Sequence, residues 1–403
     1  MNSKNIKLFS FFSGAGFLDL GFEHSGFNVA FANEIYAPFL EAYCYSRQIL
    51  GIPEPEYGYF EDDIINLTEG NRKEHLQVLV KQTRQTSDLI GFIAGPPCPD
   101  FSVGGKNRGK NGDQGKLTAC YIELICQQRP DFFIFENVKG LWSTKKHRMF
   151  YEEMKRKLMS NNYCLTERLI NAIEYGVPQD RDRLILIGFQ ESLLNNIGFD
   201  SCYSSVIPDG LFPWKQHIIY PRDQVFSYSW PKLDSFVENS VLEYPPGIPE
   251  ELTVEYWFRK NHVVGHPNAE HYFKPRAGLP KFTVIPEGDD CKKSYKRLHR
   301  WRYSPTACYG NNEVHLHPYK IRRISAAEAL AIQSLPKEFV LPSKMSLSSM
   351  FKTIGNGVPY LAAKGIAETI LDFLSQQYLT YKVPMIHQLE LPLVYSSSER
   401  YKI

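Results

Sequence analysis

The sequence of 403 residues lacks the patterns that mark several protein classes. It has no run of about 18 apolar residues, so we expect no membrane-spanning helix. Its start, Met1-Asn-Ser-Lys4, lacks the basic, apolar and small-residue layout of a signal peptide. None of the eight cysteines forms a Cys-x-x-Cys pair, so we expect neither a zinc site nor a disulfide framework. These absences favour a metal-free protein of a reducing, cytoplasmic compartment.

The chain also lacks a strong charge of either sign. It carries 46 Lys and Arg against 44 Asp and Glu, a formal net charge of +2. The total charge therefore neither favours nor excludes a nucleic acid partner, and local charge has to decide that question. The length and a hydrophobic content of 43% are sufficient for two domains with ordered cores.

Short apolar segments alternate with amphipathic ones between residues 6 and 189. The alternation predicts an α/β fold, with a Rossmann-like, mostly parallel sheet and helices on both faces. In such sheets ligands bind beside the carboxyl ends of the strands. We expect strands at 6–12, 28–32, 89–94, 131–135 and 184–189, and helices near 36–50, 71–84, 117–128 and 144–159.

The pattern changes over residues 191–318, which are rich in Pro, Tyr, Trp and His. Helical periodicity is weak there, and we expect a second, smaller, mixed and loop-rich domain of short strands. Between Tyr256 and Tyr303 eleven Lys and Arg stand against four Asp and Glu, a local net of +7. This charge and the interleaved aromatics favour nucleic acid binding; the alternative is a structural insertion with a solvated basic face. Helical pattern returns in 325–334 and 359–375, within a last segment of 319–403.

A lone cysteine, Cys98, follows the expected strand 89–94 in the stretch Gly95-Pro-Pro-Cys-Pro99. The two prolines before it stiffen the backbone. Glycines and cations crowd the following residues, 103–116. A rigidly held thiol beside a mobile basic loop indicates a nucleophile that acts on a polyanion.

Three further strand ends carry residues typical of ligand binding. Phe12-Ser-Gly-Ala-Gly16 follows the first strand, where glycines let a ligand approach the backbone closely, or simply form a tight turn. Glu34 ends the second strand, where an acid typically binds ribose hydroxyls. Asp63 precedes a helical segment and could accept from an adenine amine. The alternatives are a solvated acid at Glu34 and a helix N-cap at Asp63; together the three ends favour an adenosine cofactor.

Two further motifs carry acid and base groups. Glu136 ends the apolar strand at 131–135, where burial can raise its pKa for acid chemistry, or it caps the next helix. Arg181 and Arg183 would point the same way in an extended segment and would suit a phosphate or an oxygenated base edge. Their alternative is a pair of solvated surface arginines.

Six motifs in this order resemble the cytosine-C5 DNA methyltransferases, of the prokaryotic restriction–modification type. The resemblance covers about 1–190 and 303–372. It rests on Phe12-Ser-Gly-Ala-Gly16, Pro96-Pro-Cys-Pro-Asp-Phe-Ser102, Phe135-Glu-Asn-Val138, Gln179-Asp-Arg-Asp-Arg183, His317 to Pro336 and Ile354-Gly-Asn-Gly-Val-Pro359. It implies a class I methyltransferase fold with a catalytic domain at 1–190, a target-recognition domain at 191–318 and a segment at 319–403 that returns to the catalytic domain.

The resemblance also implies a role for each motif. Cys98 would add to C6 of a cytosine flipped out of double-stranded DNA, while Glu136 would hold N3 and the exocyclic amine. Arg181 and Arg183 would contact the base and a phosphate, and Asn137 would orient the loop. Loop 103–116 would close as a lid on the DNA. The implied DNA contacts are Ser102, Lys106, Arg108 and Thr306.

The implied cofactor is S-adenosyl-L-methionine, which leaves as S-adenosyl-L-homocysteine, and no metal is required. The family precedent is a monomer without a membrane partner, with a cognate restriction endonuclease as a genetic rather than a physical partner. The residues implied to bind the cofactor are Phe12, Ala15, Gly16, Glu34, Ile35, Asp63, Ile64, Pro97, Leu117, Asn356 and Val358.

This chain departs from the family pattern at three positions and leaves rival functions open. Pro99 replaces the usual Gln, Phe17 the usual second Gly, and Gly357 a common Ala. A tRNA methyltransferase of the same superfamily would carry Thr at the position of Ser102 and a smaller recognition region. A catalytically silent DNA-binding homologue is disfavoured by the intact Cys98 and acid–arginine motifs. A nicotinamide dehydrogenase is disfavoured by the missing third glycine and the unexplained Pro-Pro-Cys.

Overall fold

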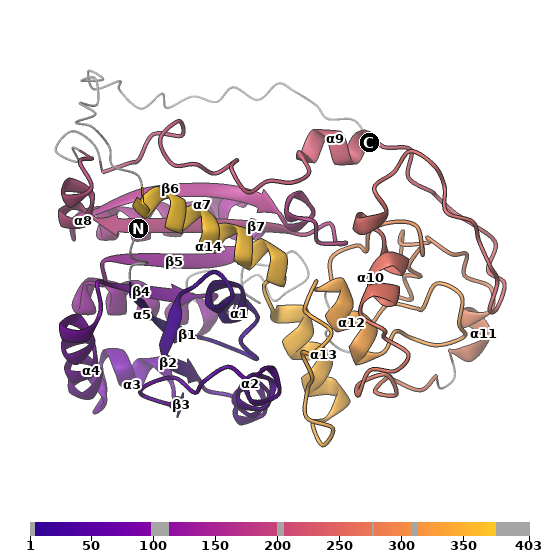
Figure 1. Ribbon diagram of the computed structural model, residues 1–403, viewed down its shortest axis with the longest axis horizontal. Helices are drawn as coiled ribbons and strands as arrows, with labels where there is room; N and C mark the ends of the chain where they lie inside the picture. Colours follow the sequence, from indigo (N-terminus) through magenta and orange to yellow (C-terminus); the bar gives the residue numbers. More distant parts are fainter. Residues whose placement is uncertain are drawn as a thin grey trace.

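The computed structural model describes residues 5–97, 113–199, 205–275, 278–292, 294–307, 309 and 313–375. Its centre is one seven-stranded sheet in the order β3-β2-β1-β4-β5-β7-β6 (Figure 1). Strand β7 runs antiparallel to both neighbours, and the other pairs are parallel. The strands are β1 (Ile6–Phe11), β2 (Asn28–Glu34), β3 (Tyr59–Glu61), β4 (Leu89–Ala94), β5 (Phe132–Val138), β6 (Tyr163–Asn171) and β7 (Asp182–Gln190).

Alternation along the strands places helices on both faces of this sheet. Successive side chains of a strand point to opposite faces, so Leu8 joins one hydrophobic core and Phe9 the other. The first face is covered by α1 (Phe17–Glu23), α8 (Glu191–Asn196) and α14 (Tyr360–Ser375). The second is covered by α3 (Ile64–Thr68), α4 (Lys73–Thr86), α5 (Asp113–Gln128) and α7 (Lys145–Met159). The predicted fold class is confirmed.

The sequence pattern does not predict two strands of the sheet. Strand β3 has only three residues, and β6 carries Thr166, Glu167 and Arg168 in its middle. An apolar run is therefore missing from both. The remaining five strands lie where the apolar segments predict them.

The part of the chain after β7 is built differently. Beyond α8, its described residues up to 318 form the short helices α9 (Arg222–Ser227), α10 (Val254–Lys260) and α11 (Leu279–Phe282), a 3-10 helix at Glu250–Leu252 and isolated β-bridges. The short strands expected there are thus absent from these described residues. Frequent prolines fix φ and remove hydrogen-bond donors, which disfavours strand ladders.

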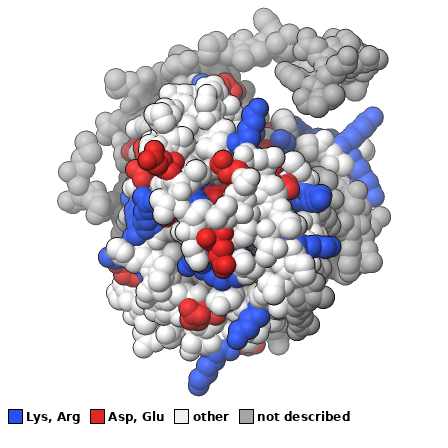
Figure 2. Space-filling view, turned by 90° about the vertical axis from the view of Figure 1, so that its right-hand side faces the viewer, with Lys and Arg blue, Asp and Glu red and all other residues white. Residues whose placement is uncertain are grey.

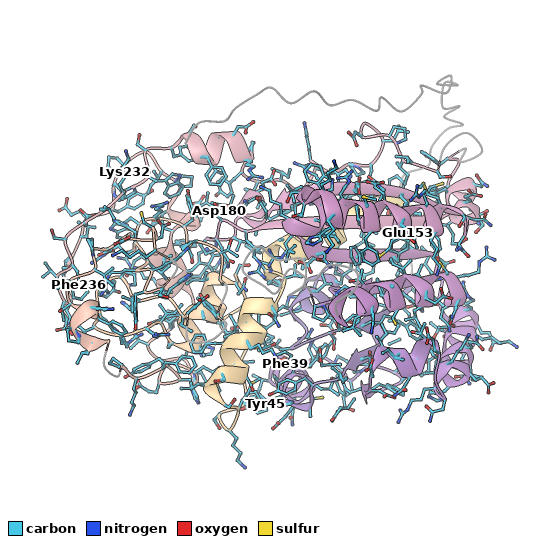
Figure 3. All side chains as sticks on the ribbon, turned by 180° about the vertical axis from the view of Figure 1, so that it is seen from behind. Phe39, Tyr45, Glu153, Asp180, Lys232 and Phe236 are labelled. Atoms are coloured by element: carbon cyan, nitrogen blue, oxygen red, sulfur yellow. The ribbon has the colours of Figure 1, made fainter. Side chains whose placement is uncertain are left out.

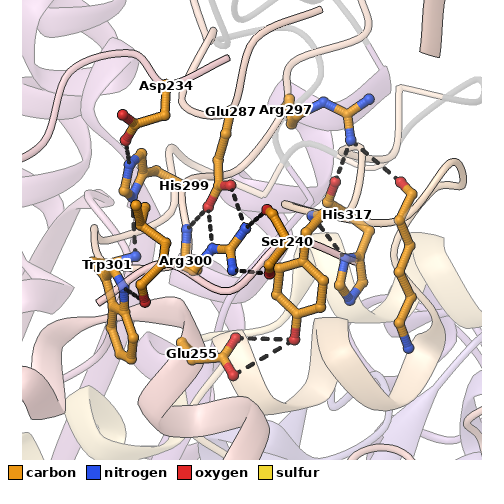
Figure 4. Close-up of polar contacts among 12 residues, drawn as sticks. Asp234, Ser240, Glu255, Glu287, Arg297, His299, Arg300, Trp301 and His317 are labelled. Carbon is orange, nitrogen blue, oxygen red and sulfur yellow. Dashed lines mark hydrogen bonds and ion pairs between the residues drawn. The ribbon is translucent and has the colours of Figure 1, made fainter. Parts of the chain in front are cut away.

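Polar contacts of three mostly buried cationic side chains hold this loop-rich region together (Figure 4). Arg300 donates to both carboxylate oxygens of Glu287 at 2.8 Å and also contacts Ser240. His299 pairs with Asp234 at 2.8 Å. Arg297, also buried, donates to main-chain oxygens. Two cations of the +7 stretch therefore act inside the domain and are not available to a ligand.

The C-terminal elements pack back on the N-terminal ones. Helix α14 lies so close to α1 that a Cβ on Gly21 would come within 2.6 Å of Ala363. Helices α12 (Ala326–Ile332) and α13 (Leu347–Asn356) share a core with α10 and with Ala15 and Phe17. The predicted domain boundaries stay predictions. None of the described helices is long and apolar enough to cross a membrane.

Candidate active site

The candidate site lies at the carboxyl edge of β1, β2, β4 and β5. Because these strands are parallel, the residues that follow them meet at one edge of the sheet. The antiparallel strand β7 starts at the same edge, since Arg183 stands opposite Val138 in the ladder. Glu34, Gly95, Glu136 and Arg183 therefore surround one region of the molecule.

Glu136 and Arg183 form an ion pair at this edge. Arg183 Nε donates to Glu136 Oε1 at 2.7 Å, and both side chains are largely buried. Arg183 Nη1 donates to the main-chain oxygen of Asp182 at 2.7 Å. The other oxygen, Glu136 Oε2, lies only 2.8 Å from where a Cβ on Gly95 would stand. The carboxyl group thus lies against Gly95, which follows β4 and stands three residues before Cys98 in the sequence.

The environment of Glu136 shifts its carboxyl towards the protonated form relative to an exposed glutamate. Burial raises the pKa of this carboxyl above its ordinary value, although the guanidinium groups of Arg183 and Arg181 oppose the shift. Desolvation penalises the charged form, and a buried acid beside a cation is typical of tuned acid–base groups. The Glu136 carboxyl therefore keeps its proton to a higher pH than an exposed glutamate does.

Arg181 does not share the surroundings of Arg183. Its side chain is fully buried, and its guanidinium donates to main-chain oxygens of Ala307, Gly355 and Gly357 at 2.9–3.1 Å. Its hydrogen bonds join three parts of the chain that are distant in sequence. The base or phosphate contact predicted for Arg181 has no counterpart in this geometry, because the guanidinium faces main-chain oxygens.

The two glycines of the loop after β1 differ in the free space beside their Cα atoms. Gly14 N donates to Glu34 Oε2 at 3.0 Å, and Tyr36 N donates to Oε1 at 2.9 Å. A Cβ on Gly14 would meet only Thr353 Oγ1, 3.9 Å away. A Cβ on Gly16 would instead come within 2.5 Å of the Tyr43 ring. Gly14 therefore leaves room for a ligand, whereas Gly16 serves internal packing.

Other features of this loop fit an adenosine ligand. Ser13 Oγ is buried and has no hydrogen-bond partner in the described structure. Ile35, directly after β2, is 59% exposed although it is apolar. Burial raises the pKa of Glu34 while the amides of Tyr36 and Gly14 oppose the shift. An unpaired hydroxyl, an apolar face and an anchored acid suit a nucleoside.

Asp63 and Ile64 stand at the start of α3. Asp63 Oδ1 accepts from Ile65 N at 3.0 Å, so the N-cap interpretation of Asp63 is confirmed. The adenine contact stays a prediction. Ile64 is almost fully buried and belongs to the core beneath the second face.

The remaining predicted cofactor residues differ in exposure. Ala15 and Val358 are buried, Asn356 is exposed, and Phe12, Pro97 and Leu117 are half-buried. Phe12 has a φ of 52°, a left-handed conformation that non-glycine residues rarely adopt and that is found at strained functional loops. Cys98, Ser102, Lys106, Arg108 and residues 103–112 of the predicted lid lie outside the described residues.

Thr306 lies where the recognition region meets the sheet. Its hydroxyl donates to the main-chain oxygen of Asp180 at 2.6 Å. Asp180 is labelled at this junction in Figure 3. The hydroxyl thus joins two parts of the chain, and its DNA contact stays a prediction.

The recognition region presents mixed charge on one face. Figure 2 views the right-hand side of Figure 1, where lysines and arginines are interspersed with acids. Arg297 and Arg300 are also buried. The local net charge of +7 therefore overstates the positive charge that this region can offer to DNA. Among the described residues, no group of three or more His, Cys, Asp and Glu side chains could hold a metal ion.

A buried polar cluster beneath the glycine loop was missed by the sequence analysis. Arg47, on α2 (Ala37–Leu50), donates to the Gly16 oxygen at 2.7 Å and pairs with Glu23 at 2.8 Å. Asp19 accepts from the hydroxyls of Ser10 at 2.9 Å and Tyr43 at 2.8 Å. Burial raises the pKa of Glu23 to about 7. The spacing of Tyr43 and Arg47 by four residues on an apolar helix face was the available signal.

Replacing Tyr43 tests whether this cluster supports the fold. Tyr43→Phe removes the donor to Asp19, which is fully buried, and should lower the free energy of unfolding by about 1–3 kcal/mol. Urea denaturation measures the loss. Tyr45→Phe on the same helix (Figure 3) is the control and should change stability by less than about 0.5 kcal/mol. Equal losses in both variants would contradict the assignment.

The fold and the carboxyl-edge site together define a class I methyltransferase. The fold of the chain resembles that of a putative DNA modification methyltransferase from an E. coli prophage (TM-score 0.62, 21% identity, 92% of this chain and 100% of that chain). The chain belongs to the C-5 cytosine-specific DNA methylase family, which it matches over residues 6–372. It is a DNA (cytosine-5-)-methyltransferase.

Two curated relatives cover most of the chain. The chain is 57% identical to the type II methyltransferase M.NmeDI of Neisseria meningitidis serogroup C, over 93% of this chain and 86% of the relative. It is 30% identical to the type II methyltransferase M.FnuDI of Fusobacterium nucleatum, over 91% and 96%. Membership in this family implies the use of S-adenosylmethionine as the methyl donor.

Proposed function

We propose that this enzyme methylates C5 of a cytosine flipped out of double-stranded DNA, as the modifying enzyme of a type II restriction–modification system. The observation that carries the proposal is the Glu136–Arg183 pair at 2.7 Å, whose carboxyl group abuts Gly95 just before Cys98. The name of the relative at 57% identity supports the restriction–modification context.

The proposed reaction begins with the thiol and the acid. The Cys98 thiolate adds to C6 of the cytosine, and the proton of Glu136 passes to N3, so negative charge does not build up on the ring. The electron pair of the C5=C6 bond becomes available at C5. S-adenosylmethionine, when bound, supplies an electrophilic methyl group on a sulfonium sulfur. After C5 is methylated, its proton leaves to a base, the C5=C6 double bond reforms and the Cys98 thiolate is expelled, while the N3 proton returns to the Glu136 carboxylate.

The residues of the glycine loop would hold the cofactor. Glu34, anchored by two main-chain amides, would accept from the ribose hydroxyls, while exposed Ile35 would cover a face of the adenine. The open space above Gly14 would admit the methionine end. The buried hydroxyl of Ser13 would gain a partner there.

Arg181 is proposed as a positioning residue. Its hydrogen bonds to Gly355 and Gly357 bracket Asn356 and lead to Val358, two predicted cofactor residues. Its bond to Ala307 joins the same point to the recognition region. Arg183 alone would touch the base, through its position beside Glu136.

The nucleic acid substrate is tested by methyl incorporation. Purified protein is incubated with labelled S-adenosylmethionine and either genomic duplex DNA or bulk tRNA. We expect label in the duplex DNA and background counts in tRNA, because residues 191–318 provide a large recognition region. Label in tRNA alone would contradict the proposal. Bisulfite sequencing of DNA from an expressing host then identifies the methylated cytosine.

A further inference from the structure

The segment that leaves β5 forms a basic and apolar surface. No acidic residue occurs between Glu136 and Glu152. Within this stretch α6 (Lys139–Ser143) is followed directly by α7. Ser143 is exposed here, as are the basic and large apolar side chains that we call the α6–α7 surface: Lys139, Trp142, Lys145, Lys146 and Met149.

Internal pairing does not account for two of these cations. Along α7, Lys155 and Lys157 pair with Glu167 and Glu123. Lys139 pairs with Asp182 at 2.9 Å. Within the described structure, Lys145 and Lys146 have no ion-pair partner and are exposed.

Helix stability does not account for them either. Lys145 and Lys146 stand in the first turn of α7, where positive charge opposes the helix dipole. The N-cap residue Thr144 makes no side-chain capping bond. The sequence therefore keeps two lysines at a position where they weaken the helix.

Large apolar groups are exposed beside these lysines. Met149 is 70% exposed and Trp142 is 38% exposed. The guanidinium of Arg148 lies over the Trp142 ring, 5.0 Å from its centroid. Flat, partly apolar side chains can pack against the sugars of a nucleic acid backbone while the neighbouring cations contact its phosphates.

The surface borders the candidate active site. Lys139 begins α6 two residues after Asn137, and its partner Asp182 is the neighbour of Arg183. Figure 3 views the sheet from the side covered by α7, with Glu153 labelled on that helix. A duplex that presents a base to Glu136 would pass close to this surface.

We propose that the α6–α7 surface binds the sugar–phosphate backbone of duplex DNA beside the flipped cytosine. The inference rests on the proposed function and assigns DNA contacts on the catalytic side, outside the recognition region. Lys145 and Lys146 neutralise phosphates, and Trp142 and Met149 pack against sugars. The contacts carry no sequence information, so they hold the duplex in position whichever sequence is read.

Removal of the two unpaired lysines tests the proposal. Binding of a fluorescein-labelled random duplex is followed by anisotropy at several salt concentrations. Lys145→Gln with Lys146→Gln should raise the Kd about tenfold at 100 mM salt and reduce the salt slope by about 2, one unit for each lost phosphate contact. Trp142→Ala should raise the Kd without changing the slope.

The control removes equal charge from two exposed lysines outside the α6–α7 surface, Lys81 on α4 and Lys157 near the end of α7, where Lys157 is paired with Glu123. Lys81→Gln with Lys157→Gln should leave both Kd and slope within twofold of the wild type. The Lys145/Lys146 variant should also keep the wild-type KM for S-adenosylmethionine and wild-type kcat at saturating DNA, with a raised KM for DNA. These values separate a lost DNA contact from a damaged fold.

The possible failures are distinguishable. If the wild type methylates duplex DNA but the Lys145/Lys146 variant matches the control in Kd and slope, the surface proposal is wrong and the proposed function stands. If the wild type methylates no duplex DNA, the proposed function fails first. A surface that serves an acidic protein partner instead would give the first of these results.

Discussion

Glu136→Gln should lower kcat at least about 100-fold at pH 7.5 while changing the affinity for DNA by less than about threefold. The amide retains the size of the carboxyl group beside Gly95 and an oxygen for Arg183, but it cannot give a proton to N3. Positioned general acids contribute about 10²–10⁴-fold. Initial rates with labelled S-adenosylmethionine measure the loss, with Cys98→Ser as the reference for complete inactivity. A Glu136→Gln enzyme within threefold of the wild type would exclude the acid role.

The pH profile gives a second test of Glu136. Burial raises its pKa, so the protonated form persists above the ordinary range and is lost as the pH rises through the raised value. kcat/KM should therefore fall on the alkaline side. Arg183→Met removes the charge that most opposes the shift, and its alkaline limb should move to higher pH. A limb that moves to lower pH would contradict this assignment.

The same shift affects stability. The pKa of Glu136 is higher in the folded than in the unfolded protein, so the folded state binds more protons above the unfolded value. The free energy of unfolding contributed by this group therefore falls as the pH rises between the two pKa values. In urea denaturation Glu136→Gln should lose less stability than the wild type over this interval.

Local pattern predicts the sheet and the acid at its edge because both depend on neighbouring residues. An apolar run such as Leu89–Ala94 is buried on both faces, and the residue after it must lie at the carboxyl edge. Glu136 follows from the same logic. Strand β6 is missed because Glu167 and Arg168 interrupt its apolar residues.

Partners distant in sequence explain what local pattern cannot predict. The spacing of Arg181 and Arg183 in the sequence would equally fit two surface arginines. In the fold, Arg181 instead binds main-chain oxygens of Ala307, Gly355 and Gly357. Arg300 counts as one positive charge in the sequence but is neutralised by Glu287 in the fold. Such pairs depend on tertiary packing, which residue type and periodicity do not encode.

Two departures from the family pattern, Phe17 and Gly357, are coupled in the fold. A Cβ on Gly357 would lie less than 3.0 Å from three atoms of the Phe17 ring. The ring is 2% exposed and packs edge-on against Phe339 with centroids 5.1 Å apart, so it has little room to move. Gly357 in turn is held by the hydrogen bond from Arg181 to its oxygen. The large ring at 17 therefore requires glycine at 357.

Gly357→Ala should accordingly weaken S-adenosylhomocysteine binding about tenfold or more and lower the free energy of unfolding by about 1–3 kcal/mol. The φ of Gly357 is −61°, which alanine adopts freely, so the effect is steric and not conformational. Isothermal titration calorimetry and urea denaturation measure the two losses. Gly210→Ala is the matched control, since a Cβ there meets no atom within 4 Å, and it should bind as the wild type does.

The double variant Phe17→Gly with Gly357→Ala distinguishes steric coupling from two independent losses. Phe17→Gly alone leaves a cavity against Phe339 and should destabilise the protein by about 3–5 kcal/mol. In its presence the added methyl group meets no ring, so the alanine should cost little and the double variant should be more stable than the sum of the single losses predicts. Cofactor affinity should follow the same cycle, because Asn356 and Val358 flank the substituted residue. Additive losses in both stability and affinity would show that the two positions act independently.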